Sequence, residues 1–483
     1  MEQITDQHSM FILPTKMKHR VYVIIVAVVL ACAFLVSCEG VDNKQPLPID
    51  ITDETPVDEV PSSNTDTKET SLSIIKTAGT LFDNSISSSE GLYKIRSDYG
   101  GSSILYYDYE TMALNYLSNQ LIATSSDENP GWIPSNEGGT VPVINNDYLY
   151  VVTVGLRPLG EMEGTPPKVF RMAMDGSDRK ELILSENMLL DQNSGIAGDD
   201  NGIYLLMDTY DAQAKAFGDY ILLYIDGKME KTEEIAKFSN NVYSINLYGA
   251  FGNELVFRIA EPQEGYEDAS RSEQFKHLKY KFICYDIVTH EETLLLQYNK
   301  GELSISYDFG NIMYYCYVGE NEIHCIDIAS REDVIALHAE DIIDLSGNET
   351  VRVYDPILDG KIGVNTSVEE PYESHKYYYD LSTGDLYEPK MVFYEDDVEH
   401  PVMIVAETED SFVVLNGYIY YTEIDTIDGM PAETTRIEKY FSLITKEDYW
   451  NNNPNYESFT DYVYPADAEI KTKYAHSAHG SGY

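Results

Sequence analysis

The stretch YKFICYDIVTHEETLLL, residues 280–296, contains the pattern that decides the fold. An aromatic-rich strand ends at Asp286, a short polar turn follows, and a second apolar strand begins near Thr293. Aspartate and threonine side chains can bond the backbone of such a turn. Aromatic and β-branched residues favour strands that pack on a pleated surface. We therefore expect residues 280–296 to form one β-hairpin of an all-β domain.

Variants of this hairpin recur along the chain, each preceded by another strand. A turn aspartate marks six copies, at Asp108, Asp175, Asp226, Asp286, Asp327 and Asp380. Units of about 55 residues cannot bury a core alone, so they must stack on one another. Short strands without amphipathic helical runs between them predict a β-propeller of about seven blades over residues 76–460. A pair of large β-sandwiches is the alternative.

The N-terminal region has the layout of an export signal. Lys18-His19-Arg20 precedes sixteen apolar residues, Val21 to Val36, and then Ser37-Cys38. A basic segment, an apolar segment and a small residue before the cut are typical of a signal peptide, and Cys38 resembles the lipidated first residue of bacterial lipoproteins. A transmembrane helix is the alternative, but it needs about 20 apolar residues. We expect a signal peptide over 1–37, with Met17 as a possible true start, and a palmitate-type lipid on Cys38.

Residues 38–75 are expected to be a disordered acidic linker between the lipid and the propeller. The segment from 39 to 73 is rich in Asp, Glu, Ser, Thr and Pro and has no aromatic residue, so it cannot form a core. Residues 461–483 are expected to be a C-terminal tail. The protein is thus predicted to be anchored by lipid at the extracytoplasmic face of the cell membrane.

The charge of the chain narrows the range of partners. There are 82 acidic and 33 basic residues, a net charge of −49. Recognition of nucleic acid depends on Lys and Arg that neutralise phosphates, so nucleic acid is excluded as a partner. An extracellular protein or a glycan fits better, and we expect a monomer. Solubility alone is the simplest explanation of the acidity.

Several local patterns resemble a known group. Gly-x-Tyr strands, the segment Leu105-Tyr-Tyr-Asp-Tyr-Glu-Thr111 and the segment Lys446-Glu-Asp-Tyr-Trp-Asn451 are similar to those of uncharacterised bacterial lipoproteins with a low-density-lipoprotein-receptor-like β-propeller. Members often carry Cys and His after the first hairpin. Residues 117–124 here contain neither, so the resemblance implies no metal or disulfide role, and the family has no established activity.

Catalytic and metal-binding motifs are scarce. No nucleophile elbow, phosphate loop, His-Glu-x-x-His or Cys-x-x-Cys motif is present. The best metal candidate is a calcium site formed by oxygen ligands spaced around a glycine: Asp191, Asn193, Asp199 and Asp200. The same residue types are common in ordinary surface loops. No other cofactor is indicated.

Cys316 and Cys325 are the one local pair of cysteines. A two-residue loop at Glu320-Asn321 would place them opposite each other in a hairpin. A disulfide is then possible, but two free thiols packed as small apolar groups are the alternative that we favour, because a disulfide requires tight geometry.

The functional hypothesis is a membrane-anchored module that binds through one end of the propeller, where loop insertions such as Glu261–Lys279 gather. One alternative is a carbohydrate-active hydrolase or lyase that uses a pair of acidic residues in the propeller funnel. Another is a structural lipoprotein of the cell envelope. Tyrosine clusters such as Tyr377-Tyr378-Tyr379 could stack on sugars, although packing between blades is the simpler expectation.

Overall fold

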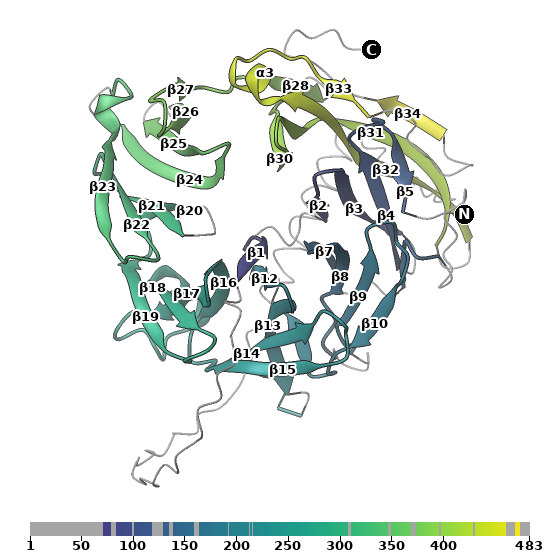
Figure 1. The fold of residues 1–483 in the computed structure, drawn as a ribbon, viewed down its shortest axis with the longest axis horizontal. Helices are drawn as coiled ribbons and strands as arrows, with labels where there is room; N and C mark the ends of the chain where they lie inside the picture. The colour runs from purple at the N-terminus through teal and green to yellow at the C-terminus, as the bar shows by residue number, and fades with distance from the viewer. Residues whose placement is uncertain are drawn as a thin grey trace, which may run out of the picture. The chain divides into compact units, whose positions relative to one another are not determined.

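The hairpins assemble into seven separate antiparallel sheets set like blades around a central opening (Figure 1). This computed structural model describes residues 71–473 except 79–83, 99–100, 118–128, 135–138, 159–163, 192, 212, 215, 308–310, 346–348, 369–372, 396–397, 428–429 and 460–468. The predicted β-propeller of about seven blades is confirmed. The two-sandwich alternative is wrong, because each blade forms a sheet of its own.

Each blade is a meander whose first strand lies innermost and whose fourth lies outermost. Blades 1 to 3 consist of β2 (Ser85–Ser87), β3 (Gly91–Asp98), β4 (Gly101–Asp108) and β5 (Leu114–Tyr116); β7 (Thr140–Asn145), β8 (Tyr148–Thr153), β9 (Lys168–Ala173) and β10 (Lys180–Ile183); and β12 (Ile196–Gly198), β13 (Gly202–Asp211), β14 (Ala216–Asp226) and β15 (Thr232–Phe238).

The remaining blades follow the same order along the chain. Blades 4 to 7 consist of β16 (Ser244–Phe251), β17 (Glu254–Pro262), β18 (Leu278–Asp286) and β19 (Glu292–Asn299); β20 (Leu303–Tyr307), β21 (Ile312–Tyr317), β22 (Glu322–Asp327) and β23 (Asp333–His338); β24 (Thr350–Leu358), β25 (Lys361–Val368), β26 (Glu373–Asp380) and β27 (Leu386–Tyr387); and β30 (Met403–Glu407), β31 (Ser411–Ile427), β32 (Met430–Thr445) and β33 (Glu457–Ser458).

A few elements lie outside this scheme. Blade 1 also pairs with β6 (Trp132–Pro134), and blade 3 pairs with β11 (Met188–Leu190) and β1 (Ser73–Lys76). The hairpin of β28 (Val392–Glu395) and β29 (Val398–Pro401) forms a small sheet, and β34 (Glu469–Lys473) pairs with β31. The helical elements are α2 (Arg271–Lys276), α3 (Lys446–Trp450) and the 3₁₀ turn η1 (Ala339–Asp341).

All six recurring aspartates occupy the turn between the third and fourth strands of their blades, as expected. Asp286 Oδ1 accepts the backbone N–H groups of Val288 and Thr289 at 2.7 and 2.8 Å. Asp380 Oδ1 binds Ser382 in the same way, and the Ser382 hydroxyl lowers the pKa of Asp380 to about 2. Blade 7 has Thr445 at this place, and its hydroxyl caps α3 instead.

The core is divided into seven apolar clusters, and each cluster fills the gap between two neighbouring blades. In β13, for example, Leu205 and Met207 pack towards blade 2, whereas Tyr204 and Leu206 pack towards blade 4. Alternate residues of a strand point to opposite faces, so the central strands are apolar on both faces. The long unbroken apolar runs of the sequence follow from this arrangement.

Blades 1 and 7 close the ring by side-chain packing alone among the residues described. Every described strand of blade 1 comes from residues 85–134 and every described strand of blade 7 from residues 403–473, so no strand is exchanged between them. Leu105 and Tyr107 of blade 1 meet Leu415 and Phe441 of blade 7 in one buried cluster. The rings of Tyr107 and Phe441 lie edge to face, with centroids 5.5 Å apart.

Two strands near the ends of the described residues lie outside the predicted propeller bounds of 76 and 460: β1 includes residues 73–75 of the predicted linker, and β34 lies in the predicted tail. Strand β1 pairs with β12 of blade 3. Strand β34 lies within residues 461–483, which the sequence analysis treats as a tail, and it pairs with β31 at Ile419–Thr422. The long hairpin of β31 and β32 extends beyond β30, and its open strand edge offers the backbone groups that β34 uses.

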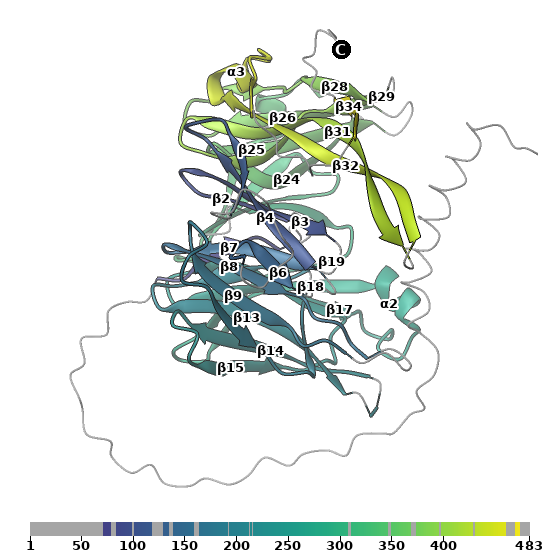
Figure 2. The ribbon, with the colours of Figure 1, turned by 90° about the vertical axis from the view of Figure 1, so that its right-hand side faces the viewer.

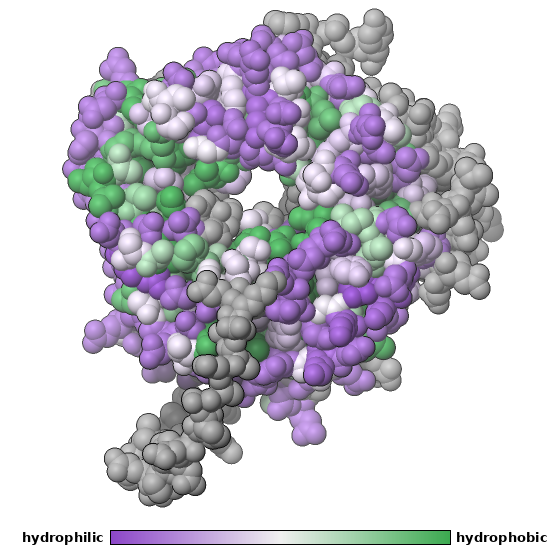
Figure 3. Space-filling view, viewed as in Figure 1, coloured by the Kyte–Doolittle hydropathy of each residue, from purple (hydrophilic) through white to green (hydrophobic). Residues whose placement is uncertain are grey.

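The two ends of the propeller carry different elements (Figure 2). Connections between second and third strands gather at one end, where the Glu261–Lys279 insertion places α2. Connections between third and fourth strands gather at the other end, where α3 lies. Hydrophilic residues cover much of the face seen in Figure 3, around the central opening. Neither helix described here is long and apolar enough to span a membrane.

Phe441→Ala tests the closure between blades 1 and 7. The side chain is 2% exposed, and removal of a buried phenylalanine costs about 3–5 kcal/mol. We expect the free energy of unfolding in urea to fall by that amount. Leu294→Ala is the control, because Leu294 is 56% exposed and should change stability by no more than about 0.5 kcal/mol. Equal effects of the two substitutions would contradict closure by packing.

Candidate functional site

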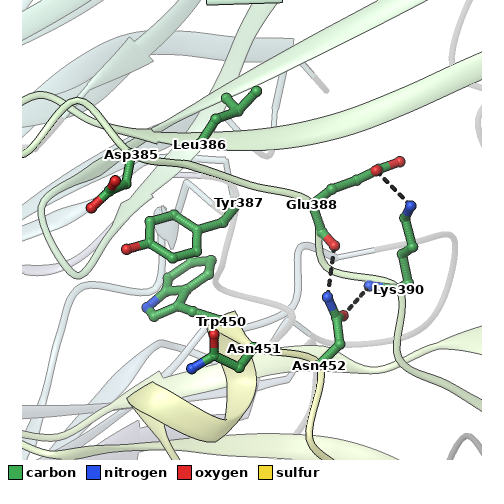
Figure 4. Close-up of a pocket in the computed structure, with 8 residues that line it drawn as sticks. All are labelled: Asp385, Leu386, Tyr387, Glu388, Lys390, Trp450, Asn451 and Asn452. Carbon is green, nitrogen blue, oxygen red and sulfur yellow. Dashed lines mark hydrogen bonds and ion pairs between the residues drawn. The ribbon is translucent and has the colours of Figure 1, made fainter.

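A hollow of about 590 Å³ lies between the outer edge of blade 6 and α3 of blade 7 (Figure 4). Two segments far apart in the sequence form it. Its lining residues are Asp385, Leu386, Tyr387, Glu388, Lys390, Trp450, Asn451 and Asn452. Six of these eight side chains can donate or accept hydrogen bonds through a charged, amide or phenolic group.

Two aromatic rings form the apolar part of the hollow. Tyr387 and Trp450 have ring centroids 5.4 Å apart (Figure 4). Trp450 is only 6% exposed, and its indole N–H donates to Asp359 Oδ2 at 2.9 Å. Tyr387 is half-buried, and no hydrogen bond of its hydroxyl is found within the described part of the chain. Trp450 is thus fixed as a support, and Tyr387, whose ring centre also lies 5.4 Å from the Lys361 ammonium, is the more exposed of the two rings.

Asn452 fixes the opposite wall of the hollow. Its side-chain amide donates to the Glu388 carbonyl at 3.0 Å and accepts the Lys390 N–H at 2.6 Å (Figure 4). The backbone of Asn452 has φ 57°, a left-handed conformation that asparagine tolerates better than most residues. This clamp joins blade 6 to the end of α3, so the two halves of the hollow keep their spacing.

Charged groups beneath the aromatic rings hold blades 6 and 7 together. Lys361 Nζ lies 2.7 Å from Asp359 Oδ2, and Lys446 Nζ lies 3.2 Å from Asp359 Oδ1 and 2.8 Å from Glu407 Oε1. Burial alone would raise the pKa of Asp359, but Lys361, Trp450 and Lys446 hold it below its ordinary value. The Lys361 ammonium also lies 5.1 Å from the centre of the Trp450 ring.

At the rim, Glu388 is already engaged by two basic side chains. Its carboxylate lies 2.7 Å from Lys390 Nζ and 3.3 Å from His375 Nδ1. Burial would raise the pKa of Glu388, but both partners lower it, so the carboxylate stays ionised. Asp385 and Asn451 are exposed beside it. An available aromatic face with amide and carboxylate groups around it can bind a flat polar molecule such as a sugar ring.

A second group of polar residues lies between blades 3 and 4. Asp208 ends the apolar part of β13, and Tyr220 is its cross-strand partner on β14. Asp191 follows β11, which pairs with the same end of β13, and is 6% exposed. Asp191 Oδ1 accepts the Asn193 N–H at 2.9 Å. No hydrogen bond or ion pair of the Asp208 carboxyl is found within the described residues.

These two carboxyl groups have unusual acidities. Burial raises the pKa of Asp191 to about 6, although the Asn193 N–H opposes the shift. Burial, together with the charge of Asp191, raises the pKa of Asp208 to about 7, and Arg271 of α2 only partly offsets it. Carboxyl groups with such pKa values can gain and lose a proton near neutral pH, which is the property required of a general acid or base.

The predicted calcium ligands do not come together. Asp191 lies at the α2 end of blade 3, whereas Asp199 binds Asn201 N, Gly202 N and the Tyr204 hydroxyl in the turn at the opposite end. Asp208 lies six residue steps along β13 from Gly202, which corresponds to about 20 Å. Asp200 follows Asp199, and Asn193 stays beside Asp191. The single site with Asp191, Asn193, Asp199 and Asp200 is therefore wrong, because a whole strand separates its halves.

The predicted register of the cysteine hairpin is also wrong. Cys316 pairs with Ile323, and Cys325 pairs with Tyr314. A loop over residues 318–321 replaces the expected two-residue turn, since Gly319 adopts φ 91°, which glycine accepts without steric cost. Cys316 and Cys325 form no disulfide with each other in this structure.

Other sequence predictions have mixed outcomes. Tyr378 is buried between blades 6 and 7, and Tyr377 and Tyr379 pack towards blade 5, as expected for packing between blades. Cys38, the signal peptide and the linker up to residue 70 lie outside the described residues. The sequence analysis missed Tyr387 and Asp208. An acidic residue after the run Gly202-Ile-Tyr-Leu-Leu-Met207 was an available signal for Asp208.

Comparisons with known proteins yield only remote similarities. No protein-family model matches the chain, and no curated protein matches it. An oligogalacturonate lyase in complex with manganese is 9% identical over 74% of this chain and 83% of its own, with a TM-score of 0.36. An oligogalacturonate lyase from Vibrio parahaemolyticus is 10% identical over the same shares, with a TM-score of 0.36. TolB from Acinetobacter baumannii is 12% identical over 74% and 77%, with a TM-score of 0.28. These values carry no argument about function.

The acidities of Asp191 and Asp208 predict how stability depends on pH. Their folded-state pKa values, about 6 and 7, lie above the unfolded value of about 3.9. Between pH about 4 and about 7 these two carboxyl groups therefore hold protons in the folded chain that they would lose in the unfolded chain. Their contribution to the free energy of unfolding falls as the pH rises through this range. We expect Asp208→Asn to raise the Tm at pH 8 and to have a much smaller effect near pH 4.5.

The control for this measurement is Asp268→Asn. Asp268 is exposed in the loop before α2, so its substitution should leave the Tm unchanged at both pH values. An effect of Asp208→Asn that is the same at pH 4.5 and pH 8 would show that proton binding by this carboxyl is not linked to folding.

Proposed function

We propose that the protein is a lipid-anchored extracytoplasmic module that binds a neutral glycan in the hollow between blade 6 and α3. The observation that carries this proposal is the half-buried Tyr387 ring, which lines one hollow together with Asp385, Asn451 and the engaged Glu388. Sugar rings present an apolar face and a rim of hydroxyl groups, and such a surface matches both.

The charge of the chain narrows the class of glycan. A net charge of −49 opposes the approach of anionic polysaccharides. Within the hollow, Lys390 is already paired with Glu388 and does not offer a free cation. Neutral or amino sugars therefore fit better than uronic acids or phosphorylated glycans. The proposed binding site thus lies at the α3 end of the propeller. The sequence predicts binding at the opposite end, which carries the Glu261–Lys279 insertion.

The membrane part of the proposal rests on the sequence. Cys38 follows a basic and apolar segment, and residues 39–73 are rich in acidic residues, Ser, Thr and Pro. Two acyl chains on Cys38 would hold the protein firmly, because each buried methylene contributes about 0.8 kcal/mol. The propeller would then stand off the membrane as a monomer with both ends open to a ligand.

The glycan site is tested with a panel of neutral oligosaccharides (cello-, malto- and chito-oligosaccharides) and with oligogalacturonate as the anionic comparison. We expect the purified full chain to bind a neutral member by calorimetry. Tyr387→Ala should weaken that binding by about tenfold or more, which corresponds to about 1.4 kcal/mol. Asn451→Ala should weaken that binding as well, because the side-chain amide would no longer contact hydroxyl groups of the sugar.

Tyr394→Ala is the matched control. Tyr394 is an exposed tyrosine on β28 outside the hollow, so binding should be unchanged. The Tm of each variant shows whether the fold persists. Binding that tolerates Tyr387→Ala, or binding of oligogalacturonate in preference to every neutral sugar, would overturn the proposed site.

A second candidate function is a glycan hydrolase or lyase at Asp191 and Asp208. The specific observation in its favour is the pair of carboxyl groups with pKa values of about 6 and 7 beside Tyr220. It ranks second because Asp191 is 6% exposed, which leaves little of it within reach of a substrate. Depolymerisation of any panel member by the parent chain, abolished in Asp208→Asn, would support this function over simple binding.

The anchor is tested by Cys38→Ala. We expect the parent to incorporate radiolabelled palmitate and to sediment with membranes, and we expect the variant to incorporate none, because no thiol remains at the first mature position. Ser37→Ala retains the thiol and a small residue, and it should be labelled like the parent. Equal labelling of Cys38→Ala and the parent would contradict lipidation at Cys38.

A further inference from the structure

The outer part of blade 5 holds a group of metal-binding side chains that the proposed function does not use. Glu320 lies in the connection between β21 and β22, and Glu322 and His324 lie two residues apart on β22, so their side chains share one face. One potential ligand atom from each of the three residues lies within 4.8 Å of the other two. His338 is the cross-strand partner of Glu322, and its Nδ1 lies 3.9 Å from Glu322 Oε1.

The orientation of His324 is fixed by two neighbours. The Tyr315 hydroxyl donates to Asp333 Oδ2 at 2.7 Å, and Asp333 Oδ1 lies 3.8 Å from His324 Nδ1. The rings of Tyr315 and His324 stack with centroids 4.8 Å apart and 15° between their planes. A carboxylate beside one ring nitrogen favours the proton on that nitrogen and leaves the other free as a ligand. His324 Nε2 is that other nitrogen, and it faces Glu322.

We propose that Glu320, Glu322 and His324, with His338 beside Glu322 as a further potential ligand, form a site for a divalent transition-metal ion, with Zn²⁺ as the best match. His324 Nε2 and Glu322 Oε2 lie 3.9 Å apart, beyond the upper limit of about 3.2 Å for an N–H···O hydrogen bond. Tetrahedral zinc ligands with bonds of about 2.0–2.2 Å lie roughly 3.3–3.6 Å apart, so a separation of 3.9 Å needs only a small closure. The group is therefore spaced to share an ion.

The types of ligand select the class of ion. Imidazole nitrogen with carboxylate oxygen suits zinc and its neighbours, whereas Ca²⁺ and Mg²⁺ prefer oxygen ligands alone. The side chains must close by a small rotation to reach the spacing of tetrahedral zinc ligands. Glu322 and His338 are each 44% exposed, which leaves them room to do so. Asp333 acts as a positioning residue, because it contacts His324 and not the ion.

The site is tested by calorimetry of the metal-free full chain with ZnCl₂, compared with His324→Ala. We expect the parent to bind one more equivalent of zinc than the variant, and we expect zinc to raise the Tm of the parent by more than that of the variant. Glu322→Gln should lose the same equivalent. Asp333→Asn should retain the site with roughly 10–100-fold weaker affinity.

His375→Ala is the matched control, because the one carboxylate that His375 contacts within the described residues is Glu388, which Lys390 also engages. The His375→Ala variant should bind as many zinc ions as the parent. A lower stoichiometry in His324→Ala can then be assigned to the proposed site and not to the general loss of a histidine. Equal apo Tm values show that the variants fold. The inference is overturned if His324→Ala and Glu322→Gln both bind zinc with the stoichiometry and affinity of the parent, or if Ca²⁺ displaces the zinc at equal concentration.

Discussion

The packing of apolar side chains between neighbouring blades is the constraint on which the rest of the structure depends. A single four-stranded blade buries little, and each central strand has apolar residues on both faces, so a blade is stable only between two others. Seven clusters fill the seven gaps, from Leu205 and Met207 on one side of blade 3 to the Tyr107 and Phe441 contact at the closure. The absence of an exchanged strand among the described residues leaves that last gap to side chains alone.

The same packing explains where polar groups collect. A residue at the end of a central strand still points into a gap between blades, but the gap opens towards solvent there. Asp208 occupies such a place between blades 3 and 4, and Asp359 and Lys361 occupy another between blades 6 and 7. Asp208 has no ion-pair partner among the described residues, and its pKa is raised to about 7 although Arg271 partly offsets the shift. The Asp359 carboxylate is instead neutralised by Lys361 and Lys446. Both positions are thus consequences of the ring, and they differ in chemistry because their neighbours differ.

Much of the fold could be predicted because its main signal is local. The turn aspartates mark the third and fourth strands, and the long apolar runs mark the second and third. The innermost strands could not be found in the same way. Ser85–Ser87 and Ile196–Gly198 have three residues each, too few to show a period. The predicted hairpin register at Cys316 was wrong because the length of the loop depends on a positive φ at Gly319. The sequence permits several conformations of this glycine, and a positive φ is only one of them.

The candidate sites were harder to predict, because they join residues that are distant in the chain. Tyr387 and Trp450 come from different blades, and the acidities of Asp191 and Asp208 depend on burial that only the assembled ring creates. His324 and Glu322 are close in sequence. The orientation of the His324 ring, however, depends on Asp333 and Tyr315, which lie on neighbouring strands. Composition restricts the proposed class of partner through charge alone, whereas the candidate sites follow from the way neighbouring blades and strands meet.

The central claim is that ligand binding takes place at the α3 end of the propeller. Hydrogen–deuterium exchange over the whole chain, with and without a bound neutral oligosaccharide, tests it most directly. Slower exchange at residues 385–390 and 446–452, with the rest of the propeller unchanged, is the predicted result. Protection confined to the Glu261–Lys279 insertion or to β13 around Asp208, with none beside Tyr387 and Trp450, would contradict the claim.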